Sequence, residues 1–286
     1  MEVSVKGRSG ASEVWRRLKK NKVAVVSMFI LIFVVLVALL APLLAPRAFD
    51  ESDSSRALEG SSRDYLLGTD RIGRCVLSRL IYGARQSLQM GFFAVTGSAI
   101  IGVTIGAIAG YYGKFTDTLL MRILDIFQGI PMFLLTVTFA AVLGPSLRNA
   151  IIAIGISMIP HPARMMRASI LSVREMEYIE AARSIDAGNR RIIISHVIPN
   201  AIAPVLVSFT MSMGMAVLSG AALSFIGLGV QPPIPEWGNM IAEARNFIRS
   251  QPQLALYPGI CVIITVLAFN MLGDGLRDAL DPRLRT

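Results

Sequence analysis

Charge is scarce in this sequence. Charged residues make up 16% of the 286 positions, whereas soluble domains carry about a quarter, and the mean hydropathy is +0.59. This composition excludes an ordinary soluble protein. The apolar residues lie in long charge-free runs, which are solvated by lipid rather than spread over amphipathic periods. The sequence therefore predicts a membrane protein.

Residues suited to catalysis or metal binding are also few. Cys75 and Cys261 form no C-x-x-C pair, which argues against a disulfide framework or a zinc site. His161 and His196 are the only histidines, and we predict no metal site. The sequence has no G-x-x-x-x-G-K-[ST] phosphate loop, so the chain is not itself an ATPase. Its spans also lack the paired carboxylates, Ser/Lys dyad or H-E-x-x-H of an intramembrane enzyme or proton-coupled carrier, which makes those classes the weaker alternatives.

The net charge of +9 indicates membrane orientation rather than a nucleic-acid partner. The basic stretch RRLKKNK precedes an uncharged run that is longer than the roughly 7 to 15 residues of a signal-peptide core. We read this run as an uncleaved first span. Its 22 residues from Val23 to Leu44 measure about 33 Å, enough for a hydrocarbon core of about 30 Å.

Six apolar segments are long enough to cross the bilayer. They are residues 23–44, 86–110, 119–143, 149–167, 201–223 and 256–273. Pro131 lies in the middle of the third and Pro160 near the inner end of the fourth. Proline frees backbone carbonyls that lipid cannot satisfy. We therefore predict that these two prolines face protein or a pathway, where they act as wall or hinge.

Five polar segments connect or flank the spans. They are a basic tail at 1–22, an external loop at 45–85 that ends in a short amphipathic helix, a charged segment at 168–200, an external loop at 224–255 and a tail at 274–286. Six spans put both termini on one side, which the positive-inside rule makes the cytoplasm. The seven arginines of loop 45–85 oppose the rule, but the loop is long and carries six acids. The predicted class is an all-α polytopic membrane protein.

The second span carries small residues four positions apart on one face. They are Ser98, Gly102, Gly106 and Gly110. Such a stripe lets two helix backbones approach closely in lipid. The alternative is that glycine is simply common in membrane helices.

Residues 177–200 are unusually polar for this chain. The pattern predicts two short helices that cross in an exposed loop, the first with an alanine-lined face containing Ala181 and Ala182. Gly188 is predicted to end the first helix in a left-handed conformation, Asn189 to cap the second and Pro199 to stop it. The alternative is a loop that lies on the lipid headgroups.

The sequence EAARSIDAG followed by HVIPNAIAP resembles the EAA loop of permease subunits of bacterial ATP-binding-cassette importers, which docks on the ATPase subunit. Five further stretches resemble, in order, the C-type permease subunit of the dipeptide/oligopeptide/nickel family. They are LGTDRIGR, VLSRLIYGAR, LSFIGLGVQPP, EWGNMI and AFNMLGDGLRDALDPR. The resemblance covers residues 67–283, the permease core, and it makes 168–200 the coupling loop.

The resemblance implies a type I ABC importer permease fold in the bacterial inner membrane. Implied partners are a homologous B-type permease, two P-loop ATPases that bind ATP and magnesium, and an external solute-binding protein. The chain itself then needs no cofactor. Peptide is the favoured cargo and nickel the alternative.

The resemblance also implies roles for individual residues. The coupling glutamate is Glu180, followed by Ala181 and Ala182, and the motif ends at Pro199. Asp186 stands where the family has glycine, and we expect Gly188 to take over the turn.

Two more positions depart from the family. Cys75 replaces a common aspartate, and Gly220 replaces a common glutamate. A lost intramembrane charge at 220 indicates either a pathway wall that depends less on a fixed charge or local repacking.

Overall fold

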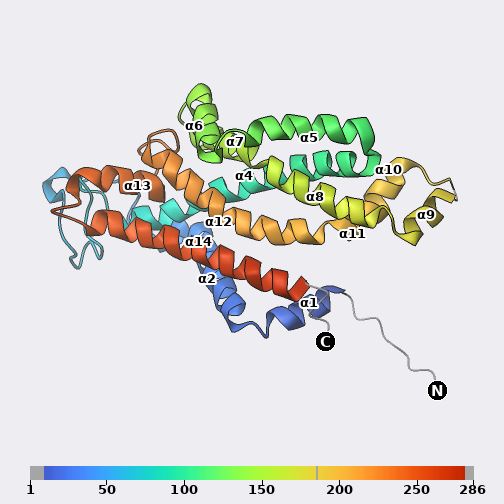
Figure 1. Cartoon of the computed structure of the whole chain (residues 1–286). Coiled ribbons are helices and arrows are strands. Elements are labelled where there is room, and N and C mark those ends of the chain that lie inside the picture. Colours follow the sequence, from blue (N-terminus) through green and yellow to red (C-terminus); the bar gives the residue numbers. More distant parts are fainter. Residues whose placement is uncertain (1–9, 185, 281–286) are drawn as a thin grey trace, which may run out of the picture.

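The computed structural model describes residues 10–184 and 186–280, which form helices and loops (Figure 1). The helices are α1 Gly10–Leu18, α2 Lys22–Leu39, α3 Ala41–Leu44, α4 Val76–Tyr112, α5 Lys114–Gln128, α6 Met132–Leu143, α7 Leu147–Met158, α8 Pro160–Val173, α9 Glu177–Ser184, α10 Asn189–Ile192, α11 Ile198–Ala201, α12 Ala203–Phe225, α13 Trp237–Ala244 and α14 Gln253–Leu280. A π-turn at Ile193–Val197 joins α10 to α11, and 3-10 turns lie at Ser54–Arg56 and Arg245–Phe247.

Four of these helices are long and apolar enough to cross a membrane, namely α2, α4, α12 and α14. The pair α5 and α6 counts as a fifth if it is one broken span. Helices α7 and α8 are shorter and follow each other through Ile159, which keeps a helical backbone. The count of six spans therefore stays a prediction.

The span predicted at 119–143 is bent next to Pro131, as that proline indicates, and the break divides it into α5 and α6. The chain bends by 86° between α5 and α6, at a break that contains Gly129 and Pro131. Proline cannot donate a helical hydrogen bond and disfavours a helical residue before it, so the helix stops and restarts there. The predicted span at 149–167 also falls into two helices, α7 and α8, but Ile159 between them keeps a helical backbone. Pro160 begins α8 as a favourable first helical residue.

Helix α4 is longer than predicted. The amphipathic helix expected in the external loop and the span at 86–110 form one uninterrupted helix of 37 residues. It ends at Gly113, whose φ of 63° suits glycine. Helix α2 instead ends before the predicted Leu44, because Pro42 cannot bond the carbonyl of Ala38.

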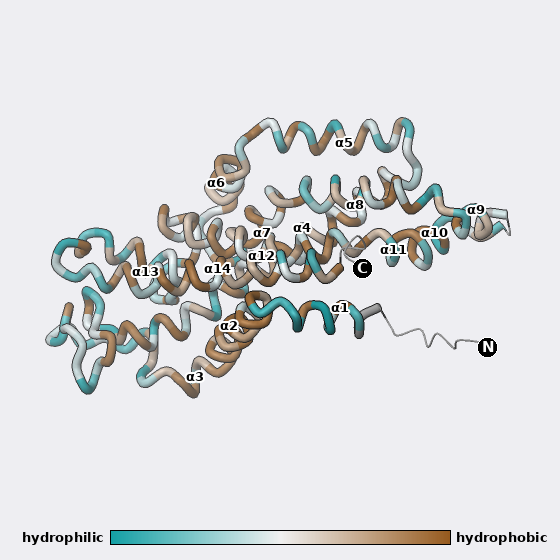
Figure 2. The backbone as a smooth tube through the Cα atoms, turned by 60° about the horizontal axis from the view of Figure 1, so that its bottom comes forward, coloured by the Kyte–Doolittle hydropathy of each residue, from teal (hydrophilic) through white to brown (hydrophobic). Residues whose placement is uncertain are grey.

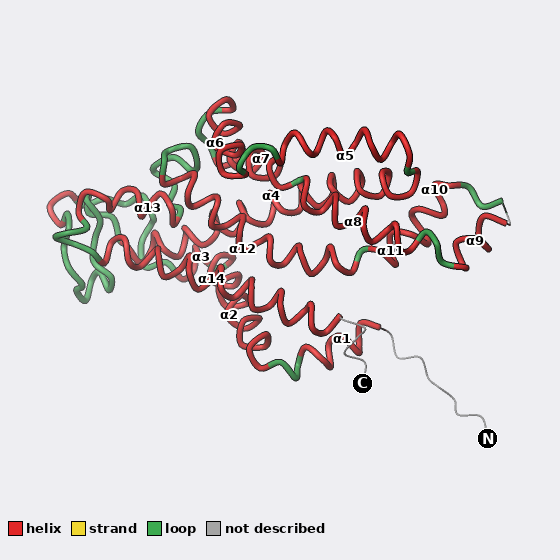
Figure 3. Tube along the Cα trace, in the orientation of Figure 1, coloured by secondary structure: helices red, strands yellow, loops and turns green. Residues whose placement is uncertain are grey.

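Helices α4, α8, α12 and α14 lie side by side, and α2 crosses them (Figure 1). Brown apolar segments occupy the middle of the molecule, as Figure 2 shows. Most long loops gather near α13 at one end (Figure 3). The opposite end holds α9, α10, α11, α1 and the end of α14 (Figure 1). Segments predicted to be external and segments predicted to be cytoplasmic thus lie at opposite ends.

The small-residue stripe lies between α4 and α8. A Cβ atom at Gly102 would lie 2.9 Å from the Ile159 carbonyl oxygen, and one at Gly110 would lie 3.0 Å from side-chain atoms of Ile170. Gly106 faces the Ala163 carbonyl even more closely. Ser98 is buried and bonds its own helix, with its hydroxyl donating to Val95 O at 2.9 Å. The three glycines therefore let the two backbones touch.

Candidate coupling surface and pathway wall

Helix α9 turns only part of its predicted face outward. Glu180 and Ala181 are exposed, but Ala182 is only 9% exposed and Ile179 is fully buried. Both pack into an apolar cluster with residues of α4, α8 and α10. The prediction that Ala182 belongs to an exposed patch is therefore wrong, because Ile179 and Ala182 lie three residues apart on the inner face of the helix. Ile185 lies outside the described residues.

The turn after α9 is built on Asp186. Its φ is 58°, in the left-handed region, and Ala187 N donates to Ala182 O at 3.2 Å. This six-to-one bond is that of a Schellman cap, with aspartate in the position that glycine usually holds. The prediction for Gly188 is wrong, since its φ is −58° and ψ is 141°. Aspartate tolerates the left-handed region better than most side chains, so the turn forms without glycine at this position.

The rest of the coupling loop also differs from prediction. Gly188, not Asn189, is the N-cap of α10, and its carbonyl accepts from Ile192 N at 3.1 Å. Asn189 Oδ1 instead accepts a hydrogen bond from the Tyr111 hydroxyl at 2.8 Å. Pro199 does not stop the helical run, because it lies in the first turn of α11. Pro199 has no N–H with which to continue the helical hydrogen bonding. The wider π-turn just before it accommodates this missing donor.

Charged side chains hold the coupling loop to the spans. Arg174, which caps the end of α8, donates to Gly110 O at 2.9 Å. Arg167 on α8 makes a bidentate pair with Asp117 on α5. Such paired contacts fix orientation as well as distance. Arg174 therefore ties the loop to α4, and Arg167 ties α8, which leads into the loop, to α5.

A cavity of about 1390 Å³ is walled by α5, α6, α7, α8, α12 and α14. Its wall is mainly apolar and includes five methionines, Met132, Met158, Met165, Met211 and Met215. Polar side chains also line the cavity. They include His161, whose Nε2 lies 2.8 Å from Ser208 Oγ, and Asp274 and Arg277 near the end of α14. Such a wall accepts mixed apolar and polar cargo.

The structure places the predicted pathway residues differently. Pro131 and Pro160 line this cavity. Gly220 does not, because it packs against the side chain of Met90 inside the helix bundle. The contributions of α12 and α14 to the wall were not predicted. The signal for them was Met211 and Met215, four residues apart on one helical face.

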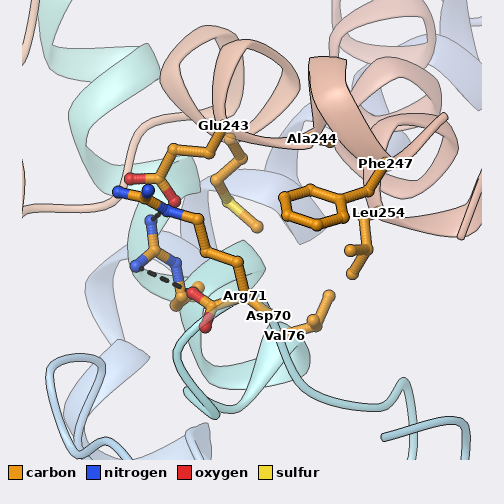
Figure 4. A pocket seen from close by; sticks show the side chains of 9 residues that line it. Asp70, Arg71, Val76, Glu243, Ala244, Phe247 and Leu254 are labelled. Carbon is orange, nitrogen blue, oxygen red and sulfur yellow. Dashed lines mark hydrogen bonds and ion pairs between the residues drawn. The ribbon is translucent and has the colours of Figure 1, made fainter. Parts of the chain in front are cut away.

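Sequence reasoning also missed a buried ionic cluster at the other end. Arg79 is only 1% exposed and donates to Glu243 of α13 at 3.0 Å. Figure 4 shows Glu243 near Asp70 and Arg71. Arg74 bonds both Glu243, at 2.7 Å, and Asp70, at 2.5 Å. Burial raises the pKa of the Glu243 carboxyl despite the attraction of Arg74. The arginine-rich stretch TDRIGRCVLSR was the sequence signal for this cluster. Its acidic partner, Glu243, lies too far along the chain to be recognised from the sequence.

Next to this cluster, Glu236 is a fully buried N-cap of α13. It accepts hydrogen bonds from Ser87 Oγ at 2.8 Å and Asn239 N at 3.0 Å. Burial raises the pKa of this carboxyl, and the hydrogen bonds offset only part of that effect. Cys75 is the N-cap of α4 and makes no capping hydrogen bond. The cysteine therefore leaves a long helix uncapped by its side chain.

Comparison with known proteins places these features in a family. Residues 102–286 match the family described as binding-protein-dependent transport system inner membrane component. Residues 10–60 match the N-terminal TM domain of oligopeptide transport permease C.

Individual relatives align over nearly the whole chain. A dipeptide transport system permease protein from Alkalihalophilus pseudofirmus is 48% identical over 96% of this chain and 90% of its own length. A glutathione transport system permease protein from Pectobacterium atrosepticum is 41% identical over 96% of this chain and 91% of its own length.

Among solved structures, the MetNI methionine ABC transporter in an inward-facing conformation is similar. Its TM-score is 0.57 at 20% identity, over 71% of this chain and 97% of that one. At this identity the likeness shows the fold alone. The chain therefore belongs to the family of inner membrane components of binding-protein-dependent transport systems, as a multi-pass membrane subunit with the fold of a type I ABC importer permease.

Proposed function

We propose that this chain forms half of the translocation pathway of an ATP-driven peptide importer in the bacterial plasma membrane. A homologous B-type permease supplies the other half, and an external solute-binding protein delivers the cargo. The observation that carries the proposal is that α8 and α12, which flank the coupling loop, also wall the large cavity. A movement of the loop therefore moves α8 and α12, which form part of the cavity wall.

Two P-loop ATPases, which bind ATP and magnesium, dock on the coupling loop in this proposal. Glu180 and Ala181 are its exposed contact residues, whereas Ala182 and Ile179 fix α9 to the bundle. Asp186, Gly188 and Pro199 shape the loop around them. Closure of the ATPases moves the loop and the spans attached to it as a rigid body and so alternates access to the cavity.

Peptide is the proposed cargo because relatives are named for dipeptide and glutathione transport. The wall of apolar and polar groups suits peptides of mixed side chains. Nickel is the alternative within the family. Competition for uptake by dipeptides or by nickel salts, in cells that carry the complete transporter, separates the two.

The coupling role is tested with Glu180→Lys. We expect the variant to insert and to purify with its sister permease, but to lose uptake, because a reversed charge opposes docking of the ATPase. Glu51→Lys is the control, since Glu51 is an exposed glutamate in the predicted external loop, away from the coupling loop. Normal uptake in Glu180→Lys would contradict this role. A wild-type chain that purifies without any P-loop ATPase would contradict the proposed function as a whole.

A further inference from the structure

The polar residues of α14 that line the cavity lie on one face of the helix. They are Asn270, Asp274 and Arg277, and their spacing of four and three residues aligns side chains along an α-helix. They belong to the half of α14 that reaches the coupling-loop end of the molecule (Figure 1). The cavity wall therefore carries a polar stripe that runs toward its inner end.

Asp274 and Arg277 are the only acidic and basic side chains, histidine aside, among the described residues that line the cavity. Both are exposed, and no ion pair joins either of them to another residue in the described part of the chain. Residues three apart on a helix have Cβ atoms about 5 to 6 Å apart. The wall therefore offers one negative and one positive charge side by side.

Methionines of α12 border this charged pair. Gly273 on α14 leaves room for Met211, since a Cβ atom at Gly273 would collide with the Met211 side chain. Met211 and Met215 line the cavity four residues apart on one face of α12. Methionine side chains are flexible and polarisable, so they adapt to groups of different shape. The two charges thus lie next to a surface that accepts varied apolar groups.

We propose that Asp274 and Arg277 bind the two charged ends of a short peptide at the inner end of the cavity. Asp274 receives the α-ammonium group and Arg277 the α-carboxylate, while Met211 and Met215 accept the side chains of the peptide. Two extended residues span about 7 Å, which is close to the separation of the two charges on α14. A guanidinium group binds a carboxylate through two parallel hydrogen bonds, which adds orientation to the attraction.

This inference rests on the proposed function and deepens it, because it makes two free termini the feature of the cargo that the membrane subunit recognises. A nickel ion fits the same pair poorly. Proteins hold nickel with several nitrogen or oxygen ligands. Arg277 instead places a positive charge one turn from Asp274, and that charge repels a cation.

The test measures equilibrium binding of a tritium-labelled dipeptide, alanyl-phenylalanine, to the complete transporter in lipid nanodiscs. The binding protein is left out, so that its own selectivity does not enter. Unlabelled alanyl-phenylalanine, its N-acetyl form and its C-terminal amide compete for the site. We expect each blocked form to bind about ten-fold more weakly than the free dipeptide, as the loss of one charge-assisted hydrogen bond of about 1.5 kcal/mol produces.

Two variants assign the ends of the peptide separately. Asp274→Asn should abolish the preference for a free α-ammonium group and keep the preference for a free carboxylate. Arg277→Gln should do the reverse, whereas Arg277→Lys keeps the charge and should retain a preference for the free carboxylate. A merely structural role of either residue would weaken the binding of all three peptides by the same factor.

Asp278→Asn and Arg122→Gln are the control variants, because both residues are exposed and lie outside the cavity wall. They should keep both preferences. Because each variant is compared with wild type for the same three peptides, the size of the blocking groups does not affect the comparison.

Three results would overturn the inference. They are a wild-type transporter that binds no dipeptide saturably, equal binding of the three peptides to wild type, and a loss in Asp274→Asn or Arg277→Gln that is the same for all three. Failure of the proposed function looks different. In that case peptide-loaded binding protein would stimulate neither peptide uptake nor ATP hydrolysis by the wild-type transporter, whatever the binding measurement gives.

Discussion

Ala182 and Ala187 are joined by a hydrogen bond that closes the corner of the coupling loop. The N–H of Ala187 donates to Ala182 O at 3.2 Å, and the chain reverses through Asp186 at a φ of 58°. The bond depends on that left-handed residue, because an ordinary φ would carry Ala187 away from the end of α9. The position of Glu180 on α9 thus depends on a residue six positions later.

Replacement of Asp186 by valine is expected to weaken this corner. A β-branched side chain in the left-handed region costs about 1 to 2 kcal/mol, whereas Asp186→Gly removes the conflict with Cβ altogether. Hydrogen exchange of the α9 amides should therefore be faster in Asp186→Val than in Asp186→Gly, which should stay close to wild type. Equal exchange in the two variants would show that the corner does not hold α9.

An aspartate in place of Cys75 should stabilise α4. Cys75 is an N-cap without a capping hydrogen bond, and aspartate there accepts from the free N–H groups of the first turn. We expect Cys75→Asp to gain about 1 kcal/mol in thermal unfolding of the detergent-solubilised protein. Cys75→Ala, which adds no cap, is the control and should gain nothing. A lower stability of Cys75→Asp than of wild type would mean that the free-energy cost of burying the carboxylate exceeds the gain from the capping hydrogen bond.

The sequence predicted most of the spans because a long charge-free run has few alternatives in lipid. It could not predict that α4 continues outward past Arg85 and Arg79, since an arginine-rich helix looks too polar until its partner Glu243, 164 residues away, is in place. Pro131 indicated a bend, but the 86° angle depends on what α6 packs against. In the coupling loop, the local motif located Glu180 correctly as an exposed residue. The inward face of Ala182 depended on Met166, Ile170 and Val197 from other segments.

Close packing of α4 on α8 predicts opposite effects for two glycines of the same helix. A Cβ at Gly106 would collide with the backbone of α8, whereas one at Gly97 meets nothing within 4 Å. Gly106→Ala should therefore destabilise the protein by about 1 to 3 kcal/mol, because the backbones must separate. Gly97→Ala should be neutral or stabilise by up to about 1 kcal/mol, because alanine favours helix. Thermal unfolding of both variants in one detergent measures the difference, and equal melting temperatures would contradict the packing.

Buried Glu236 predicts that the stability of the protein falls as pH rises. Burial raises the pKa of this carboxyl in the folded state, so the folded protein holds the proton more tightly than the unfolded chain. Its contribution to stability is complete below the ordinary pKa of glutamate. This contribution to stability is lost as pH rises from the ordinary pKa of glutamate through the raised pKa of Glu236 in the folded protein.

Glu236→Gln isolates this effect. The single carbonyl oxygen of glutamine keeps the hydrogen bond from Asn239 N, and its amide nitrogen donates to Ser87 Oγ instead of accepting from it. Glutamine does not ionise, so the variant should lose that part of the pH dependence and match or exceed wild type at alkaline pH. Glu236→Ala is the contrasting variant, because it leaves the N-cap of α13 and Ser87 without their acceptor and should be less stable at every pH. The measurement is thermal unfolding of the solubilised protein across the pH range. Parallel curves for wild type and Glu236→Gln would show that the carboxyl stays ionised in the folded protein, with Ser87 and the backbone N–H groups alone sufficient to hold its charge.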